Sequence, residues 1–364
     1  MFALIVPRPP RLDSGFTRGS TRGWWSVRLL RLLLQLPVLP ALLAAAAAVG
    51  PAGAGPLALV TNQGSDSVSV IDLAERRVVK EIAVGKSPAG VAVSAAAGRA
   101  YVTTPGDHGL SVIDLATLTE LRRLPAGQGA VGVAVAPDGR RVYVADWYGG
   151  RLRAFDAASL APLGEVAVGR APAGVAVSAD SRRVYVAARD DDEVVELDTQ
   201  GLAVTARFKV GQHPFAIGLS PDGTTLLALN VLSDDVSLVD LATRRTLATL
   251  PVGLAPYGLA FDAPGRLAYV TNQHAGSVSV IDLASRSVRA VHPAGEYPEG
   301  IAHLAASAQA GPPGDAAAVA GILLVVSWMD DCVHLVDATS GRRLATIATG
   351  TNPRGFGEML WLRP

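Results

Sequence analysis

The sequence predicts an all-β protein, a seven-bladed β-propeller made of four-stranded antiparallel blades. The first observation is an internal repeat, in which an aspartate ends the second apolar run of each copy, at Asp72, Asp114, Asp156, Asp198, Asp240, Asp282 and Asp337. The first five steps between these aspartates are 42 residues each, and the last is 55. The second observation is that each copy contains four short apolar runs. A period of this length with four strands per copy is typical of propeller blades.

Each predicted strand recurs at the same place in the repeat. The first strand, rich in β-branched and aromatic residues, is expected at 57–62, 99–104, 141–146, 183–188, 225–230, 267–272 and 322–327. The second alternates polar and apolar residues, as in the SVSVID runs at 67–72 and 277–282, and the third follows, as at 78–84. The fourth is expected at 90–94, 132–136, 174–178, 216–220, 258–262, 300–304 and 355–359. Pro-Asp-Gly turns at 137–139 and 221–223 supply the positive φ of tight hairpins.

The two ends of the repeat array predict how the ring closes. Leu57 begins a first strand, but its matching fourth strand is at 355–359, so we expect one blade to combine both ends of the chain. Such pairing removes the free sheet edges that an open array would leave. The last step exceeds the others by 13 residues, which form an insertion at 307–319. Its Gly/Pro/Ala composition predicts an exposed loop.

Residues 1–54 have the composition of an export signal. A basic stretch is followed by an apolar run at 32–49 and by the small residues Ala52, Gly53 and Ala54, the order found in secretory signal peptides. An uncleaved membrane anchor is the alternative, because the apolar run reaches 18 residues. We expect residues 55–364 to form the propeller, and the protein to be periplasmic or secreted as in bacterial export.

Composition and motifs exclude several function classes. The chain has 32 basic and 32 acidic residues, so no nucleic-acid partner is expected. Cys332 is the only cysteine, so no internal disulfide, c-type heme or cysteine zinc site is expected. The histidines form no metal motif, and no serine-hydrolase motif is present. We therefore predict no metal site, no cofactor and no catalytic residue, in a monomer that meets a membrane only if residues 1–54 stay attached.

Several runs resemble the YVTN family of β-propeller repeats. They are YVTN at 269–272, LVTN at 59–62, SVSVID at 67–72 and 277–282, and VGxxPxGVAVS at 84–94 and 168–178. With its export signal, the chain is similar to the periplasmic YncE-type members. The resemblance implies a seven-bladed propeller but no single chemistry, because members are mostly binding or surface proteins. Neighbouring propeller families include lactonases and the heme d1 domain of nitrite reductases.

The loops after the first and third strands are expected to open on one face of the ring, which we call the loop face. Polar and aromatic residues that depart from the repeat gather there. The candidate binding residues are His108, Trp147, Tyr148, Arg170, His213, His274, Glu296, Tyr297, Trp328 and Arg354. Such a set suits an anionic or planar ligand or a protein partner. The alternative is a solvated rim in which no two of these residues cooperate.

His303 and Glu358 occupy a fourth-strand position that is valine in other copies, as at Val93, Val135 and Val177. They belong to consecutive blades, so we expect the innermost strands to place them side by side. A buried structural pair is favoured, because burying either charge alone is unfavourable. The alternative is a pair of functional groups in the channel.

The sequence favours binding over catalysis. We expect an interaction module that uses the loop face to bind a protein partner or a small ligand. One alternative is an enzyme of the lactonase type that acts at the same mouth. Another is a carrier or assembly partner for a redox cofactor or metal. The fold alone does not choose among them, since propellers host unrelated functions.

Overall fold

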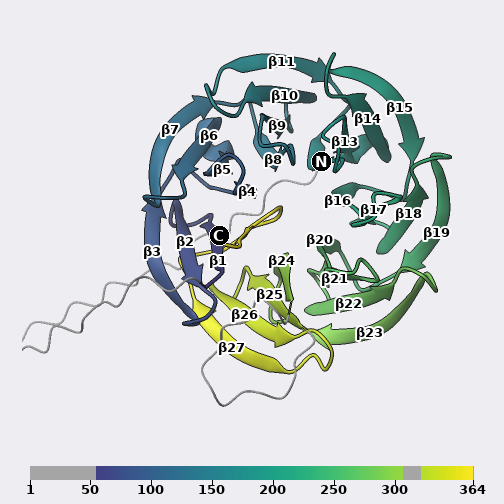
Figure 1. Ribbon diagram of the computed structural model, residues 1–364. Coiled ribbons are helices and arrows are strands. Elements are labelled where there is room, and N and C mark those ends of the chain that lie inside the picture. The colour runs from purple at the N-terminus through teal and green to yellow at the C-terminus, as the bar shows by residue number, and fades with distance from the viewer. Residues whose placement is uncertain (1–54, 306–320, 364) are drawn as a thin grey trace, which may run out of the picture. The chain divides into compact units, whose positions relative to one another are not determined.

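The computed structural model describes residues 55–305 and 321–363 (Figure 1). Contacts divide the chain into Met1–Pro51 and Ala52–Pro364, and the second unit is described here by itself. The predicted export signal at 1–54 and the insertion at 307–319 lie outside the described residues. Within the described part, no helix combines the length and the apolar character needed to cross a membrane.

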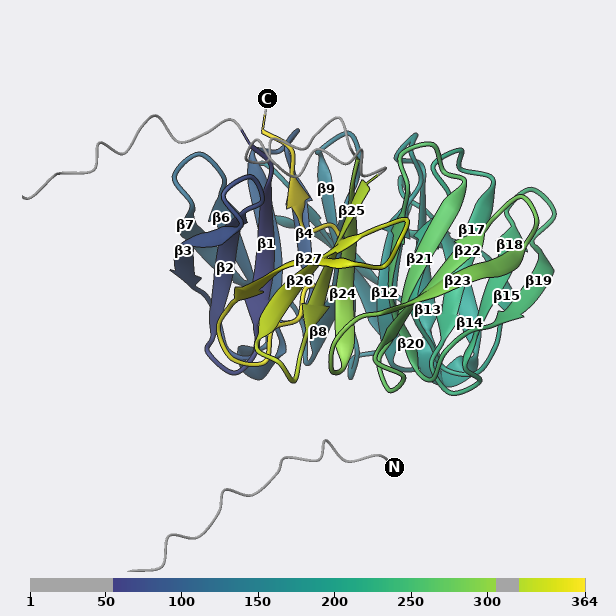
Figure 2. The ribbon, with the colours of Figure 1, turned by 90° about the horizontal axis from the view of Figure 1, so that it is seen from below.

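Seven four-stranded antiparallel sheets form a ring of blades, which confirms the predicted fold class (Figures 1 and 2). From the inner to the outer strand, blade 1 contains β28 (Leu360–Trp361), β1 (Leu57–Asn62), β2 (Ser67–Asp72) and β3 (Arg77–Ala83). Blade 2 contains β4 (Val91–Ser94), β5 (Arg99–Thr104), β6 (Gly109–Asp114) and β7 (Thr119–Pro125). Blade 3 contains β8 (Ala130–Val135), β9 (Arg141–Asp146), β10 (Arg151–Asp156) and β11 (Pro162–Ala167).

The remaining four blades repeat this order. Blade 4 contains β12 (Pro172–Val177), β13 (Arg183–Ala188), β14 (Glu193–Asp198) and β15 (Ala203–Lys209). Blade 5 contains β16 (Pro214–Leu219), β17 (Thr225–Asn230), β18 (Asp235–Asp240) and β19 (Arg245–Pro251). Blade 6 contains β20 (Pro256–Phe261), β21 (Leu267–Asn272), β22 (Ser277–Asp282) and β23 (Ser287–Pro293). Blade 7 contains β24 (Pro298–Ala305), β25 (Gly321–Ser327), β26 (Cys332–Asp337) and β27 (Arg343–Ala348). Within the described residues, two 3₁₀ turns lie in other blades, η1 (Pro105–Asp107) and η2 (Arg189–Asp191).

The inner strands of neighbouring blades approach closely because most of them carry a glycine near the start, whereas blade 5 has Ala216 there. A Cβ atom at Gly132 would lie 1.9 Å from the carbonyl oxygen of Ala173, and one at Gly258 would lie 2.1 Å from that of Glu299. Any larger residue would push the two blades apart. The Thr271 hydroxyl donates to the same Glu299 carbonyl at 2.7 Å, which ties blade 6 to blade 7. The narrow centre of the ring therefore follows from the Gly positions of the repeat.

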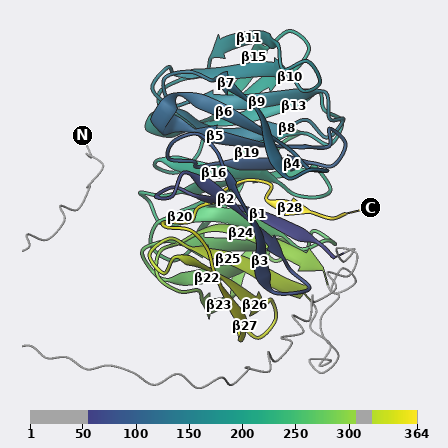
Figure 3. The same ribbon diagram turned by 90° about the vertical axis from the view of Figure 1, so that its left-hand side faces the viewer.

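Ring closure by the two chain ends is confirmed, but the closing strand is displaced. The strand is β28, beside β1 (Figure 3), rather than the predicted 355–359. Residues before it bond to two blades: Leu59 N–H donates to Met359 O at 2.9 Å in blade 1, and Val93 N–H donates to Glu358 O at 2.7 Å in blade 2. Gly355 and Gly357 have φ of 117° and 114°, which interrupts extended pairing there.

Candidate functional site

Two sets of inner-strand residues, one residue per blade, surround the centre of the ring. Each member of the first set directly follows the residue at the start of its inner strand, which is usually a proline. The first set comprises Arg354, Ala89, Val131, Ala173, Phe215, Tyr257 and Glu299. The second set lies four residues further along and comprises Glu358, Val93, Val135, Val177, Leu219, Phe261 and His303. Because the inner strands start at the loop face, the first set lies nearer to that face.

Aromatic side chains close the centre of the ring near the loop face. Phe215 stacks on Tyr257 with ring centroids 4.2 Å apart, and Phe356 lies edge-on to Phe215 at 5.3 Å. Trp147 adds a fourth ring 6.2 Å from Phe215. Ala89 and Ala173 belong to the same buried cluster, so side chains from opposite sides of the ring meet there. We call Trp147, Phe215, Tyr257 and Phe356 the aromatic plug.

A buried ion pair lies beside the aromatic plug. Arg354 Nε is 3.3 Å from Glu299 Oε2, and Gln273 donates to Glu299 Oε1 at 2.7 Å. Burial raises the pKa of Glu299, although the positive charge of Arg354 opposes this effect. Glu299 and Arg354 occupy the same strand position in consecutive blades. This pair therefore has the arrangement predicted for His303 and Glu358, but one layer closer to the loop face.

A cavity of about 770 Å³ lies on the other side of the aromatic plug. It is lined by the second set of inner-strand residues and by the turns that follow the inner strands, so it lies toward the face opposite the loop face. Its wall is mostly Ala, Val, Gly, Leu and Phe, and the ionisable side chains on it are Asp262, His303 and Glu358. A cavity of this size, with a few polar side chains among apolar ones, is typical of a small-molecule site.

The predicted pairing of His303 with Glu358 is wrong, although both residues line the cavity. His303 instead stacks on Tyr269, with centroids 5.5 Å apart and planes 6° apart. Burial lowers the pKa of His303, and Asp262 only partly offsets this, so the imidazole is neutral near pH 7. Glu358 is open to the cavity but closely surrounded by protein, and this desolvation raises the pKa of its carboxyl. No ion pair joins Glu358 to another of the described residues.

The loop-face residues predicted from sequence separate into groups. His274, Tyr297 and Trp328 form a row, with centroids 5.4 and 6.1 Å apart. Trp147 belongs to the aromatic plug and Arg354 to the buried ion pair. Tyr148, which follows Trp147 in the sequence, is 70% exposed. The others are held by separate local contacts: His108 to Gln128 O, Arg170 to Asp191, the His213 N–H to Asp192, and the Glu296 N–H to Asp330.

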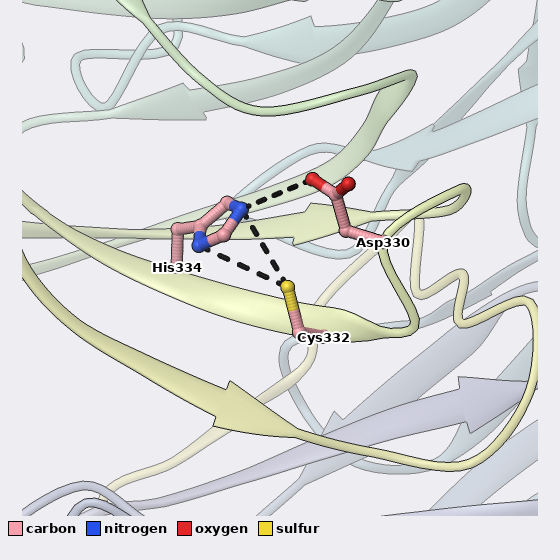
Figure 4. Close-up of side chains that lie close together, drawn as sticks. All are labelled: Asp330, Cys332 and His334. Carbon is pink, nitrogen blue, oxygen red and sulfur yellow. Dashed lines mark hydrogen bonds and ion pairs between the residues drawn. The ribbon is translucent and has the colours of Figure 1, made fainter.

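The histidines of the loop face do not form a metal-type cluster. Across the described ranges, one group of three potential ligands has its ligand atoms within 4.8 Å of one another, and it comprises Asp330, Cys332 and His334 (Figure 4). These residues lie in blade 7, at the loop-face end of β26. Desolvation raises the pKa of the Cys332 thiol to about 11. Burial lowers the pKa of His334, so both groups are neutral near pH 7.

The sequence contains signals for the residues that our prediction missed. Phe215, Tyr257 and Glu299 occupy the first set of inner-strand positions, where other blades have Ala89, Val131 or Ala173. A large or charged residue at that position departs from the repeat, as Arg354 does. The Cys332 and His334 pair also departs from the repeat, because Ser67 and Ser69 are their counterparts in blade 1. Comparing every strand position between blades would have identified both groups.

Two family models match parts of the chain. The model described as the cytochrome D1 heme domain matches residues 52–174, and that of the choice-of-anchor I domain matches residues 125–300. Neither reaches half of the 364 residues, and neither tests the finer YVTN resemblance. A comparison with curated proteins found no match.

Similar solved structures agree on the propeller fold. Hydrazine synthase of Kuenenia stuttgartiensis matches with a TM-score of 0.67 and 18% identity, over 77% of this chain and 92% of that chain. Dihydro-heme d1 dehydrogenase NirN, in complex with DHE, matches with a TM-score of 0.60 and 19% identity, over 85% of this chain and 76% of that chain.

These comparisons contradict the prediction that no cofactor is involved. A heme-domain model matches the first blades of this propeller, and one of the similar structures holds DHE. The prediction failed because it relied on short linear motifs. A tetrapyrrole bound inside a ring contacts single residues from several blades, and such a site leaves no continuous motif in the sequence.

Proposed function

We propose that this protein binds a heme-type tetrapyrrole in the central cavity of its propeller. The observation that carries the proposal is the cavity of about 770 Å³, closed at one end by the aromatic plug and walled mainly by apolar inner-strand residues. The match of residues 52–174 to a heme-domain family supports the class of ligand. In this proposal the ring acts as a binding module or carrier, in line with one of the functions considered from the sequence.

The residues of the cavity fit an apolar macrocycle. His303 is the neutral imidazole on the wall, and neutral imidazole is a common ligand of heme iron. Its stacking on Tyr269 fixes the plane of the ring. Among the residues that the structure describes, no Arg or Lys lines the cavity to pair with the carboxylates of such a group. Desolvation raises the pKa of Glu358, and its carboxyl can donate a hydrogen bond to such a carboxylate when it is protonated.

When bound, the group would supply redox and axial-ligand chemistry. The residues of this chain bind it, orient it and limit water. The aromatic plug closes the loop-face end, so solvent reaches the cavity from the opposite face. The small inner-strand residues would leave space for the macrocycle, and His303 is the lining residue that could hold its metal.

Titration with hemin, the ferric protoporphyrin used as probe, tests this proposal. We expect saturable binding of one hemin per chain, with a shifted Soret absorption band. His303→Ala should weaken binding about tenfold or more, because it removes the metal ligand. Val177→Trp should also weaken binding, because it fills the cavity.

Two matched controls accompany this titration. His108→Ala removes an exposed histidine of the loop face, and Val291→Trp adds the same bulk to an outer strand. Both should bind hemin as the wild type does. Equal loss in His303→Ala and His108→Ala, or binding that never saturates, would contradict the proposal.

The loop face favours a second function, the docking of a protein partner. Exposed large apolar side chains gather in its loops, namely Tyr148, Leu232, Leu254, Tyr297 and Met329, with exposures of 40–70%. Aromatic residues of this kind anchor protein interfaces. A photo-crosslinker placed at Tyr148 or Tyr297 in the native host should capture one defined partner, whereas one at Leu121 on an outer strand should not. Equal labelling at all three positions would contradict a docking face.

The export predicted from the sequence is compatible with both proposed functions, tetrapyrrole binding and partner docking. Residues 1–54 have the order of a secretory signal. The mature chain is then expected to begin at Gly55. An uncleaved segment would instead keep the propeller tethered to the membrane.

A further inference from the structure

We propose that Asp330, Cys332 and His334 bind a single zinc ion in blade 7, at a site separate from the central cavity (Figure 4). Each residue offers one ligand of a type that zinc accepts: a carboxylate oxygen, a thiolate sulfur and an imidazole nitrogen. Cys332 and His334 alternate along β26, so both side chains point to the same face of the blade. Asp330 reaches them from the turn that precedes the strand.

Two of the three distances among the ligand atoms are close to those around a tetrahedral zinc ion. With Zn–S of about 2.3 Å and Zn–N of about 2.05 Å, the tetrahedral angle sets the S···N separation at about 3.5 Å. The same reasoning gives about 3.3 Å between imidazole nitrogen and carboxylate oxygen. Cys332 Sγ lies 3.5 Å from His334 Nε2, and His334 Nε2 lies 3.3 Å from Asp330 Oδ2. These two pairs are therefore close to the required separations, and all three ligand atoms lie within 4.8 Å of one another.

Two other blades show a purely structural use of this position. In blade 6 the first strand ends in Asn272, whose amide donates to Ser277 (3.1 Å) and Ser279 (2.9 Å) on the second strand. The same network joins Asn62 to Ser67 and Ser69 in blade 1. Its counterparts in blade 7 are Ser327, Cys332 and His334. In blades 1 and 6, one Asn and two Ser are therefore enough to join the first and second strands at these positions. Blade 7 has a different residue at all three.

Surrounding contacts orient the proposed ligands. Thr346 Oγ1 lies 3.1 Å from His334 Nδ1, which leaves Nε2 facing Asp330 Oδ2. Cys332 Sγ lies beside the ring, 3.5 Å from Nε2 and 3.8 Å from Nδ1. Ser327 Oγ donates to Asp330 Oδ2 at 2.7 Å, and the Glu296 N–H donates to the same oxygen at 3.0 Å. Such outer contacts are typical of metal sites. Gly295 keeps the space beside His334 free, because a Cβ there would lie 2.6 Å from Nε2.

Access and coordination number suit an ion that enters from solvent. Cys332 and His334 are 4% and 2% exposed, whereas the Asp330 side chain is 33% exposed at the loop face. Three protein ligands leave a fourth position for water or for the Ser327 hydroxyl. Binding forms a metal–thiolate bond and releases the Cys332 proton to solvent. The expectation from sequence that one cysteine excludes zinc overlooked mixed ligand sets, in which a single thiolate is sufficient.

Metal titration of the chelator-treated full chain tests the proposal. We expect one Zn²⁺ per chain in competition with a chromophoric chelator. Co²⁺ should bind the same site and give a thiolate-to-cobalt charge-transfer band, which reports coordination by Cys332 directly. Cys332→Ser should remove the band and weaken zinc binding roughly a hundredfold or more, because outer-contact changes alone cost 10- to 100-fold.

A second variant keeps the test valid if a single change disturbs folding. The triple change Ser327→Asn, Cys332→Ser and His334→Ser rebuilds the network of blade 6, which this fold already accommodates. It should melt near the wild type and bind no zinc at this site. Ser277→Ala, at the position in blade 6 that matches Cys332, should bind zinc normally. Unchanged zinc binding in the triple variant, or wild-type Co²⁺ binding without the thiolate band, would overturn the proposal.

Discussion

His303 places a nitrogen ligand on the wall of the central cavity. At the same strand position, five other blades carry Val, Leu or Phe, so the wall is apolar by default. His303 adds a nitrogen ligand whose low pKa keeps it uncharged, and its stacking on Tyr269 limits its rotation. A neutral, oriented imidazole in an apolar cavity suits metal ligation better than it suits an ion pair. This explains why the expected pair with Glu358 does not form.

Glu358→Gln is expected to stabilise the protein at neutral pH. Desolvation raises the folded-state pKa of Glu358, and none of the described residues forms an ion pair with it. A carboxyl whose pKa is raised on folding destabilises the native state above that pKa. This penalty shrinks as pH falls below the folded pKa and is lost below the unfolded pKa. Gln keeps the shape without the charge, so thermal unfolding at pH 7 should occur at a higher temperature.

The pH dependence separates this effect from a packing effect. The difference in melting temperature between Glu358→Gln and the wild type should shrink as pH falls toward 4.5, the usual pKa of this carboxyl. Glu75→Gln, an exposed change at an ordinary surface ion pair, is the control and should show little difference at either pH. A Glu358→Gln variant less stable than the wild type at pH 7 would contradict this account.

At the scale of elements, the terminal segment from Gly355 to Arg363 contributes more to the packing of the ring than the short strand β28 suggests. Besides β28, it supplies Phe356 to the aromatic plug and buries Met359 to 1% exposure. Its backbone bonds to blade 1 through Leu59 and to blade 2 through Val93. The segment therefore closes the ring and joins it to the next blade.

Deletion of residues 355–364 should cost roughly 5 kcal/mol or more of unfolding free energy, because the loss of a buried Phe or Met each costs about 2–5 kcal/mol. Denaturant unfolding followed by circular dichroism measures this loss. The matched control removes residues 307–319, which brings the hairpin of blade 7 to the length found in the other blades. That deletion should change stability little. A similar loss in both variants would contradict the role of the terminal segment.

The sequence predicted the elements more completely than the site. The 42-residue period determines the strand order of every blade, because each copy must bury the same apolar faces against its neighbours. The closing strand was displaced since Gly355 and Gly357 allow a path that no other blade takes. The site depends on which residues meet across the ring. Phe215, Tyr257 and Phe356 come together only after closure, so no local pattern identifies them as a plug.

At the scale of the whole molecule, the aromatic plug divides the ring into two ends with different chemistry. The loop face carries exposed apolar side chains, the row of His274, Tyr297 and Trp328, and the proposed zinc ligands. The opposite end opens into the cavity with His303 and Glu358. We infer that a partner docks at one face while a tetrapyrrole occupies the other. The two activities are therefore separable by mutation.

The absorption spectrum and native mass of the protein, purified from its native host, test the central claim most directly. The account predicts a visible absorption band, together with extra mass equal to one tetrapyrrole on a polypeptide that begins at Gly55. His303→Ala, expressed and purified in the same way, should lose most of that band. A colourless protein with the mass of the polypeptide alone, from cells that contain heme, would contradict the proposed function.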